Sequence, residues 1–160
     1  MGNKQTRITV LCEDTTHYEF IREYLSCLGF DKRRITSFPN LKGSIKLNNA
    51  KVIKYYPQLV ATYRQKKNYQ DIAVIVMIDA DNTEEKPDIE RRPIALNKSL
   101  DEEEGKRNKD LRFPDEKIAI FVPTRNIETW FAYVENQDNN SEEINYKKEK
   151  YSRGDNPVKR

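Results

Sequence analysis

Histidine, cysteine and long apolar runs are all scarce in this chain of 160 residues, and each scarcity argues against a class of protein. One histidine and two cysteines are too few for the four ligands of a usual zinc site. His17 has no serine or cysteine partner in a nucleophile-elbow pattern, which argues against a Ser-His-Asp or Cys-His hydrolase. The longest apolar run, Ile72 to Ile78, is far below the roughly 20 residues of a membrane-spanning helix.

Cysteine placement and the N-terminal sequence bear on the cellular compartment. Cys12 and Cys27 lie inside apolar patterns without CxxC spacing, which predicts buried thiols rather than a disulfide or a zinc framework. Residues 1–7 carry charge but no apolar segment, so we expect no secretory signal. These features predict a soluble, cytoplasmic protein that makes no membrane contact.

Charged residues are nearly as frequent as apolar ones, at 34% against 36%, which predicts a thin core. Six Phe, nine Tyr and one Trp help, because bulky side chains bury much area per residue. The length fits one compact domain, which we place at residues 7–135. Residues 136–160 hold almost no core-forming side chain, so we expect them to be disordered or to dock on a partner.

Charge is unevenly distributed along the chain. Residues 1–72 hold 13 Lys and Arg against 6 Asp and Glu, whereas residues 73–116 hold 8 against 13. Residues 117–160 are almost balanced, at 8 against 7. A basic half followed by an acidic middle is typical of a polyanion-binding surface beside a carboxylate cluster. Solvated helix faces with patchy charge are an equally acceptable explanation.

Short apolar segments alternate with longer amphipathic ones, which predicts βαβ units on a parallel sheet and hence an α/β fold. We expect strands at residues 8–12, 34–38, 72–78 and 117–122. We expect helices from Thr15 or Thr16 to Leu28, at 49–68 with Pro57 kinking or dividing the helix, at 87–104 with an irregularity at Pro93, and at 123–135. Glu19 lies three residues after Thr16, as in a capping box, and Gly29 is a stop signal.

Three of the four predicted strands end in chemically capable side chains. Such residues matter because function in parallel α/β sheets collects at the carboxyl ends of strands. Glu13 and Asp14 follow the first strand, Asp79 and Asp81 follow the third, and Arg125, Asn126 and Glu128 follow the fourth. Glu13, Asp79 and Asp81 could together bind one Mg²⁺ or Mn²⁺ ion, which prefers hard oxygen ligands.

Simpler explanations exist for the same residues. An Asp after a buried strand is often a helix cap or a turn residue, and Glu128 could only face solvent. Asp79-Ala-Asp-Asn-Thr83 also fits the DxDxT motif of haloacid-dehalogenase-type phosphatases, with Asp79 as nucleophile. That family normally places this strand first and needs a longer chain, so we rank the phosphatase below a nuclease.

Basic and aromatic residues supply candidate nucleic-acid contacts. We assign this role to Lys42, Lys46 and Arg125, because phosphate neutralisation requires Lys and Arg. Four tyrosines interleave with lysines and arginines between residues 51 and 69, and they could stack on bases. The core edge of a basic helix is the first interpretation of these tyrosines, which are Tyr55, Tyr56, Tyr63 and Tyr69.

Three segments together resemble the motifs of Toprim domains. They are Val10-Leu-Cys-Glu-Asp-Thr-Thr16, Val74-Ile-Val-Met-Ile-Asp-Ala-Asp81 and Pro123-Thr-Arg-Asn-Ile-Glu-Thr-Trp130. Over residues 7–135 the chain is similar to small stand-alone bacterial Toprim proteins, related to nucleases of the overcoming-lysogenization-defect (OLD) family and to RloB-like proteins. The resemblance implies a Rossmann-like Toprim fold, with about four mainly parallel strands flanked by helices, that binds Mg²⁺ and cuts nucleic acid.

The resemblance also implies residue roles. Glu13 matches the first-motif glutamate, a general acid/base or metal ligand, and Asp79 and Asp81 match the metal-binding DxD. Asp14 stands where that motif commonly has Gly, and Arg125 or Glu128 is the only candidate for a later catalytic group. Toprim proteins of this kind are associated with ATPases in phage defence, which implies an ATPase partner.

Two functions follow as expectations. The first is a Mg²⁺-dependent nuclease acting on DNA or RNA, and the second is a catalytically decayed Toprim-like subunit that binds nucleic acid or regulates a partner. The choice between DNA and RNA, and whether the chain forms a homo-oligomer, stay open at this point.

Overall fold

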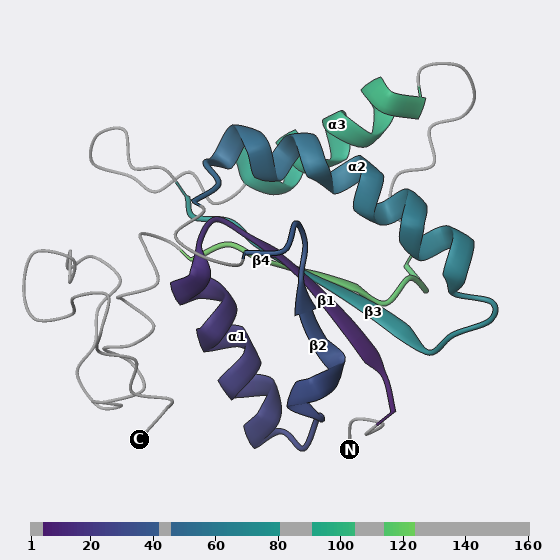
Figure 1. The fold of residues 1–160 in the computed structure, drawn as a ribbon. Helices are drawn as coiled ribbons and strands as arrows, with labels where there is room; N and C mark the ends of the chain where they lie inside the picture. Colours follow the sequence, from purple (N-terminus) through teal and green to yellow (C-terminus); the bar gives the residue numbers. More distant parts are fainter. Residues whose placement is uncertain (1–4, 42–45, 81–90, 105–113, 124–160) are drawn as a thin grey trace, which may run out of the picture.

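The computed structural model describes residues 5–41, 46–80, 91–104 and 114–123 (Figure 1). The four strands form one sheet in the order β2-β1-β3-β4, and every neighbouring pair is parallel. The predicted α/β class, a parallel sheet flanked by helices, is therefore confirmed. In chain order the elements are β1 (Arg7–Cys12), α1 (Thr15–Cys27), the 3-10 helix η1 (Lys32–Arg34), β2 (Ile35–Ser37), α2 (Asn49–Lys66), β3 (Ile72–Met77), α3 (Arg91–Glu104) and β4 (Ile118–Phe121).

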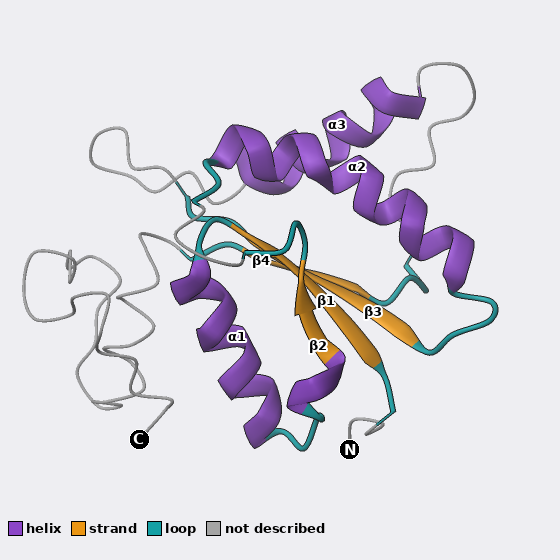
Figure 2. Cartoon of the chain, viewed as in Figure 1, coloured by secondary structure: helices purple, strands orange, loops and turns teal. Residues whose placement is uncertain are grey.

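The helices cover the two faces of the sheet in a three-layer arrangement (Figure 2). α1 packs on one face against β1, while α2 packs on the other face against β1 and β3 and also contacts α3. Right-handed crossovers explain this, because the chain leaves β1 in one direction to reach β2 and returns past β1 to reach β3. The strand order therefore reverses between β1 and β3.

β3 is the centre of the core. Val74, Ile75, Val76 and Met77 are all buried, as the unbroken apolar run predicts for a strand covered on both faces. β3 pairs with β1 along its whole length, from Arg7 opposite Ile72 to Cys12 opposite Met77. The carboxyl ends of these two strands consequently lie side by side.

The start of α1 differs from the prediction. Asp14 is the N-cap, and its carboxylate accepts a hydrogen bond of 3.0 Å from the backbone N–H of His17. The expectation that Thr15 or Thr16 caps the helix is wrong, because both lie in the first turn; the aspartate one residue earlier is also a preferred cap. Gly29, at φ +92°, ends the segment as predicted.

Both prolines lie within the described span of a helix. α2 runs from Asn49 to Lys66 as a single helix with Pro57 inside it, so the proline does not divide it. Pro93 falls in the first turn of α3, where a backbone N–H has no intrahelical partner to lose.

Only one of the two cysteines is buried as predicted. Cys12 is buried, but Cys27 is exposed because it is the last residue of α1, and both are free thiols. Within the described ranges, no helix has the length and apolarity needed to span a membrane. The predicted helix at 123–135 and the segment 136–160 lie outside the described residues, apart from Pro123.

Candidate functional site

The carboxyl ends of β1 and β3 bring the two acidic motifs into contact. Glu13 follows β1 directly, and Asp79 is the second residue after β3. The Glu13 carboxylate accepts a hydrogen bond of 3.0 Å from the backbone N–H of Asp79. The flanking N–H groups of Ile78 and Ala80 bond to the carbonyls of Phe121 and Pro123, so the backbone around Asp79 is fixed on the β4 side as well.

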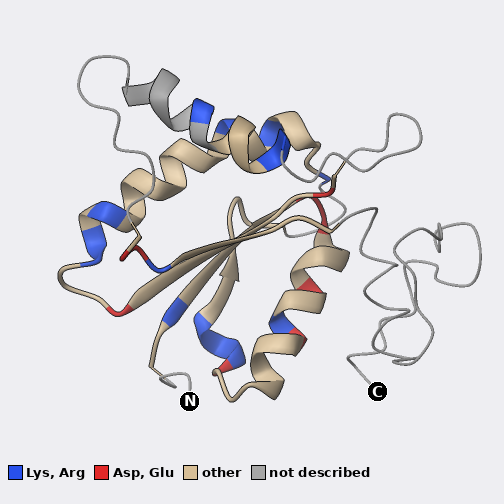
Figure 3. Ribbon diagram, turned by 180° about the vertical axis from the view of Figure 1, so that it is seen from behind, with Lys and Arg blue, Asp and Glu red and all other residues tan. Residues whose placement is uncertain are grey.

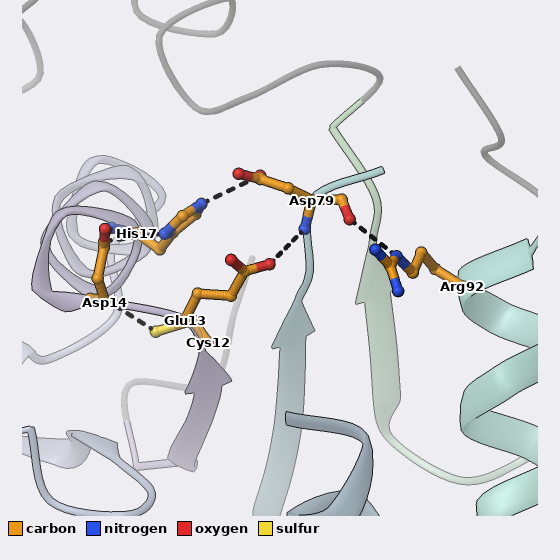
Figure 4. A network of polar contacts seen from close by, with 6 residues as sticks. All are labelled: Cys12, Glu13, Asp14, His17, Asp79 and Arg92. Atoms are coloured by element: carbon orange, nitrogen blue, oxygen red, sulfur yellow. Dashed lines mark hydrogen bonds and ion pairs between the residues drawn. The ribbon is translucent and has the colours of Figure 1, made fainter. Parts of the chain in front are cut away.

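His17 joins these residues into a chain of polar contacts (Figure 4). Its ring lies between two aspartates, with Nδ1 2.9 Å from Asp14 Oδ1 and Nε2 3.1 Å from Asp79 Oδ1. The His17 side chain is only 4% exposed, whereas each of the two carboxylates is 20% exposed. The histidine thus ties the start of α1 to the end of β3.

The charge state of this network follows from its contacts. Burial alone would lower the pKa of His17, but its hydrogen bonds to Asp14 and Asp79 and their negative charges outweigh burial and raise that pKa to about 10. Burial likewise opposes ionisation of Asp14, but the hydrogen bonds and charge of His17 lower the pKa of Asp14 to about 2. His17 is therefore an imidazolium that donates both ring N–H groups at neutral pH.

The surrounding backbone contacts hold the acidic residues in place. Arg92, from α3, donates a hydrogen bond of 3.0 Å from Nε to the carbonyl oxygen of Asp79. The N–H of Leu47 donates to the carbonyl of Glu13 at 2.6 Å. The site is thus assembled from four separate parts of the chain, and Figure 4 shows the Glu13 and Asp79 side chains entering it from neighbouring strand ends.

Cys12 lies beside the site without the properties of a nucleophile. Its thiol donates to the carbonyl of Asp14 at 3.4 Å. Burial, together with the negative charges of Asp14 and Glu13, raises its pKa far above the ordinary value. Because the thiolate is the reactive form, Cys12 acts here as a buried apolar group.

The carboxylates of this site meet part of what a divalent cation needs as ligands. Glu13 and Asp79 supply carboxylate oxygens, the ligand type that Mg²⁺ prefers, and both side chains retain access to solvent. Asp14 and Asp79 flank a single imidazolium, and Glu13 bonds to the Asp79 backbone, so three carboxylates stand against the positive charges of His17 and Arg92 and leave net negative charge. Across the residues that the structure describes, no three His, Cys, Asp or Glu side chains are grouped as metal ligands. Asp81, the third predicted ligand, lies outside the described residues.

The other predicted site residues divide into two groups. Lys46 is exposed and immediately precedes Leu47, so it is placed near Glu13. Lys42, Arg125 and Glu128 lie outside the described residues, as does Asn126.

The tyrosines of α2 are mainly structural, as first interpreted. Tyr56 and Tyr63 are buried in the core, and Tyr55 packs edge-on against Phe38 with ring centroids 5.9 Å apart. Of the four, only Tyr69 is open to solvent, at 87% exposure. A continuous base-stacking surface on this helix is therefore not formed.

Sequence reasoning missed His17. A single histidine suggested no catalytic or metal-binding set, and its second aspartate partner is 62 positions away. The signal that could have found it is local. Asp14 and His17 are three positions apart, which is the spacing between an N-cap side chain and the third residue of the helix. That third residue, here His17, lies next to the end of the preceding strand.

Comparison with known proteins identifies no relative of this chain. The chain matches no protein-family profile, no curated protein and no solved structure. The Toprim resemblance therefore stands on the sequence motifs, and the functional argument depends on the geometry of the site.

Proposed function

We propose that the chain is a Mg²⁺- or Mn²⁺-dependent nuclease of the Toprim type that hydrolyses phosphodiester bonds in DNA or RNA. The observation that supports this most is the hydrogen bond between Glu13 and Asp79, which joins two acidic motifs 66 positions apart. It lies where the strand order reverses between β1 and β3, the usual place for a ligand site in an open α/β sheet.

Each residue of the site has a distinct part in this proposal. Glu13 and Asp79, with Asp81, hold the cation, which supplies activation of water and stabilisation of the leaving oxygen when bound. His17 orients the Asp79 carboxylate, and Arg92 fixes the Asp79 backbone. Lys42, Lys46 and Arg125 are assigned to the nucleic-acid backbone, and the resemblance adds an ATPase partner and a role in phage defence.

One observation favours a second candidate, a catalytically decayed Toprim-like subunit that binds nucleic acid or regulates a partner. His17 Nε2 lies 3.1 Å from Asp79 Oδ1, so the imidazolium already satisfies one oxygen that a cation would need. A site stabilised by an internal cation could retain the fold without binding metal.

A cleavage assay tests the nuclease proposal. Purified protein is incubated with supercoiled DNA, single-stranded DNA or RNA in Mg²⁺, in Mn²⁺ or in EDTA. We expect metal-dependent cleavage that falls by more than about 100-fold in Glu13→Gln and in Asp79→Asn, because each loses a charged ligand worth several kcal/mol. The matched control is Asp115→Asn, which removes an exposed carboxylate at the other end of the sheet. Cleavage that is absent, or equal in all four proteins, contradicts the proposal.

Two further measurements separate the alternatives. Salt-sensitive nucleic-acid binding that needs no metal and survives Asp79→Asn supports the decayed subunit. Turnover of a generic phosphomonoester, blocked by beryllofluoride, supports the phosphatase in which Asp79 is the nucleophile.

A further inference from the structure

A groove of about 660 Å³ lies at the opposite end of the sheet from the acidic site. Its floor is the face of β1, β2 and β3 that α2 covers, and its wall is the second half of α2. The register of β1 separates the two sites, because Arg7 begins the strand at the groove and Cys12 ends it beside Glu13. At about 3.3 Å per residue this separation is roughly 17 Å.

The part of the groove floor that β1 and β2 form is polar where the fold calls for apolar residues, whereas the part from β3 is apolar, with Ile72, Ala73 and Val74. β1 is a central strand, and central strands of parallel sheets covered on both faces are normally apolar throughout. Thr9 lies in the middle of β1, directly opposite Thr36 on β2, and both line the groove. Thr9 is half-buried and Thr36 is exposed. The sheet thus presents two neighbouring hydroxyl groups instead of core side chains.

The side of α2 that faces the groove also combines buried apolar residues with polar ones. Leu59 and Tyr63 on this side are buried, yet Thr62 and Lys66, at the same helical spacing, also line the groove. Thr62 donates its hydroxyl to the carbonyl of Gln58 at 2.9 Å, so its oxygen remains an acceptor site beside the groove. Polar residues on the groove-facing side of the helix indicate that this part of α2 does not serve core packing alone.

Cations dominate the lining. Four basic residues come from β1, η1 and α2, while Asp31 is the one carboxylate among the described lining residues; the basic set is Arg7, Arg33, Arg34 and Lys66. Asp31 is paired with Arg33 at 2.9 Å, and Arg34 donates to the neutral carbonyl of Gln5. Figure 3 shows the basic residues at the start of β1, in η1 and at the end of α2. The groove therefore keeps a clear excess of positive charge.

We propose that this groove binds the phosphate groups of a nucleotide-sized ligand, such as a nucleoside triphosphate. Guanidinium groups and hydroxyls are the donors that phosphate oxygens prefer, and here three arginines and the hydroxyls of Thr9 and Thr36 line one recess. The volume falls within the range of small-molecule sites, which is about 300 to 1,000 Å³. A recess between a helix and a sheet suits a compact ligand better than a duplex. The site is distinct from the acidic edge and does not depend on the nuclease proposal.

Calorimetric titration of the full chain in EDTA tests this inference. EDTA removes divalent cations, so the acidic site cannot contribute to binding. The probes are inorganic triphosphate, ATP and a short single-stranded oligonucleotide at low ionic strength, where charge interactions are least screened. We expect binding of triphosphate and of ATP, weakened about tenfold in Arg7→Gln, because each lost charged hydrogen bond changes affinity by about this factor or more.

Three further variants make the test specific. Thr9→Val preserves strand propensity and shape while removing the hydroxyl, so it is expected to weaken binding of triphosphate without loss of the fold. Asp31→Asn removes the only described carboxylate of the lining and is expected to strengthen binding. Lys54→Gln, an equal loss of charge on α2 away from the groove, is expected to leave binding unchanged.

The outcomes are decisive in both directions. Binding of triphosphate and ATP that follows this pattern supports the groove as a phosphate site. Three results overturn the inference: no triphosphate binding, equal weakening by Lys54→Gln and Arg7→Gln, or binding of the oligonucleotide alone. Loss of cleavage in the Asp79→Asn assay has no bearing on these results, since the two sites use different residues.

Discussion

The two ends of the parallel sheet have opposite chemistry. At the carboxyl ends of β1 and β3, the carboxylates of Asp14 and Asp79 flank the buried imidazolium of His17, and the Glu13 carboxylate accepts from the Asp79 backbone. At the amino ends, arginines and a lysine surround a groove with threonines on its floor. The small net charge of +3 conceals this separation, because it sums the two ends.

The two ends also differ in how their ion pairs are solvated. His17 is 4% exposed between its aspartates, whereas the Arg33 side chain, paired with Asp31, is 88% exposed. Buried pairs are costly to break, because the remaining charge is left without a partner, while exposed pairs contribute little. We therefore expect the acidic end to determine stability and the basic groove to be available for a ligand.

The largest expected contrast concerns the two cysteines. Cys12 is buried at the acidic end with a raised pKa, while Cys27 is exposed at the last residue of α1. We expect iodoacetamide to modify Cys12 more than about 1,000-fold more slowly than Cys27, because Cys12 must wait for local unfolding. Mass spectrometry of peptides from timed samples measures both rates. Similar rates in the folded protein contradict the described burial of Cys12.

Removal of His17 is expected to have the next largest effect. His17→Ala leaves Asp14 and Asp79 without their shared cation, and we expect a loss of about 3 kcal/mol in the free energy of unfolding. This is the lower end for a buried pair, because both carboxylates keep 20% exposure. Urea unfolding followed by circular dichroism provides the measurement.

The control for His17→Ala is a variant that breaks an ion pair at the basic end of the sheet. Asp31→Asn breaks the exposed pair with Arg33 but keeps a side chain that can cap η1, so the urea midpoint is expected to stay unchanged. If Asp31→Asn destabilises the protein as much as His17→Ala, the contrast between the two ends is wrong.

The pH dependence of stability sharpens the same contrast. The pKa of His17 is raised from 6.5 to about 10, so its contribution is fully present below pH 6.5 and is lost as pH rises toward 10. The pKa of Asp14 is lowered from 3.8 to about 2, so its contribution is present above pH 3.8 and is lost as pH falls toward 2. In EDTA, the stability difference between the unmodified chain and His17→Ala should shrink between pH 6.5 and pH 10. A difference that is constant over this range contradicts the assigned charge state.

The smallest expected effect tests an exception at the amino end. Glu116, two residues before β4, has a fully buried side chain that accepts from Arg64 Nε at 2.7 Å. Glu116→Gln keeps the shape but removes the charge, so we expect a loss of about 2 kcal/mol from the weakened hydrogen bonds. Urea unfolding beside Asp115→Asn, the exposed neighbour, measures it. An equal, negligible effect in both variants shows that burial does not control the strength of these pairs.

Much of the fold could be predicted because the pattern of apolar residues along the chain indicates where the strands and helices lie. The run around Val74 to Met77 predicted a buried strand, and polar residues after the strands predicted that Glu13 and Asp79 would lie at one edge. Both inferences depend only on local sequence and on the geometry of parallel sheets.

What could not be predicted depends on contacts between distant segments. His17 gained its role from Asp79, and the aspartate that caps α1 replaced the expected threonine. The groove was hidden because Thr9 is an ordinary strand residue and Lys66 an ordinary helix residue until the sheet and α2 are brought together. Local composition showed a basic half of the chain but not where its charges gather.

We propose above all that the acidic end, and not the basic end, binds a divalent cation. Titration of ¹⁵N-labelled protein with Mn²⁺ tests this directly, because the paramagnetic ion broadens the amide signals nearest to it. We expect the signals of Glu13 and Asp79 to broaden first, those of Arg7 and Ile72 to persist, and the broadening to disappear in Asp79→Asn. Broadening centred on Arg7 or Ile72, or none at the acidic end, contradicts the account.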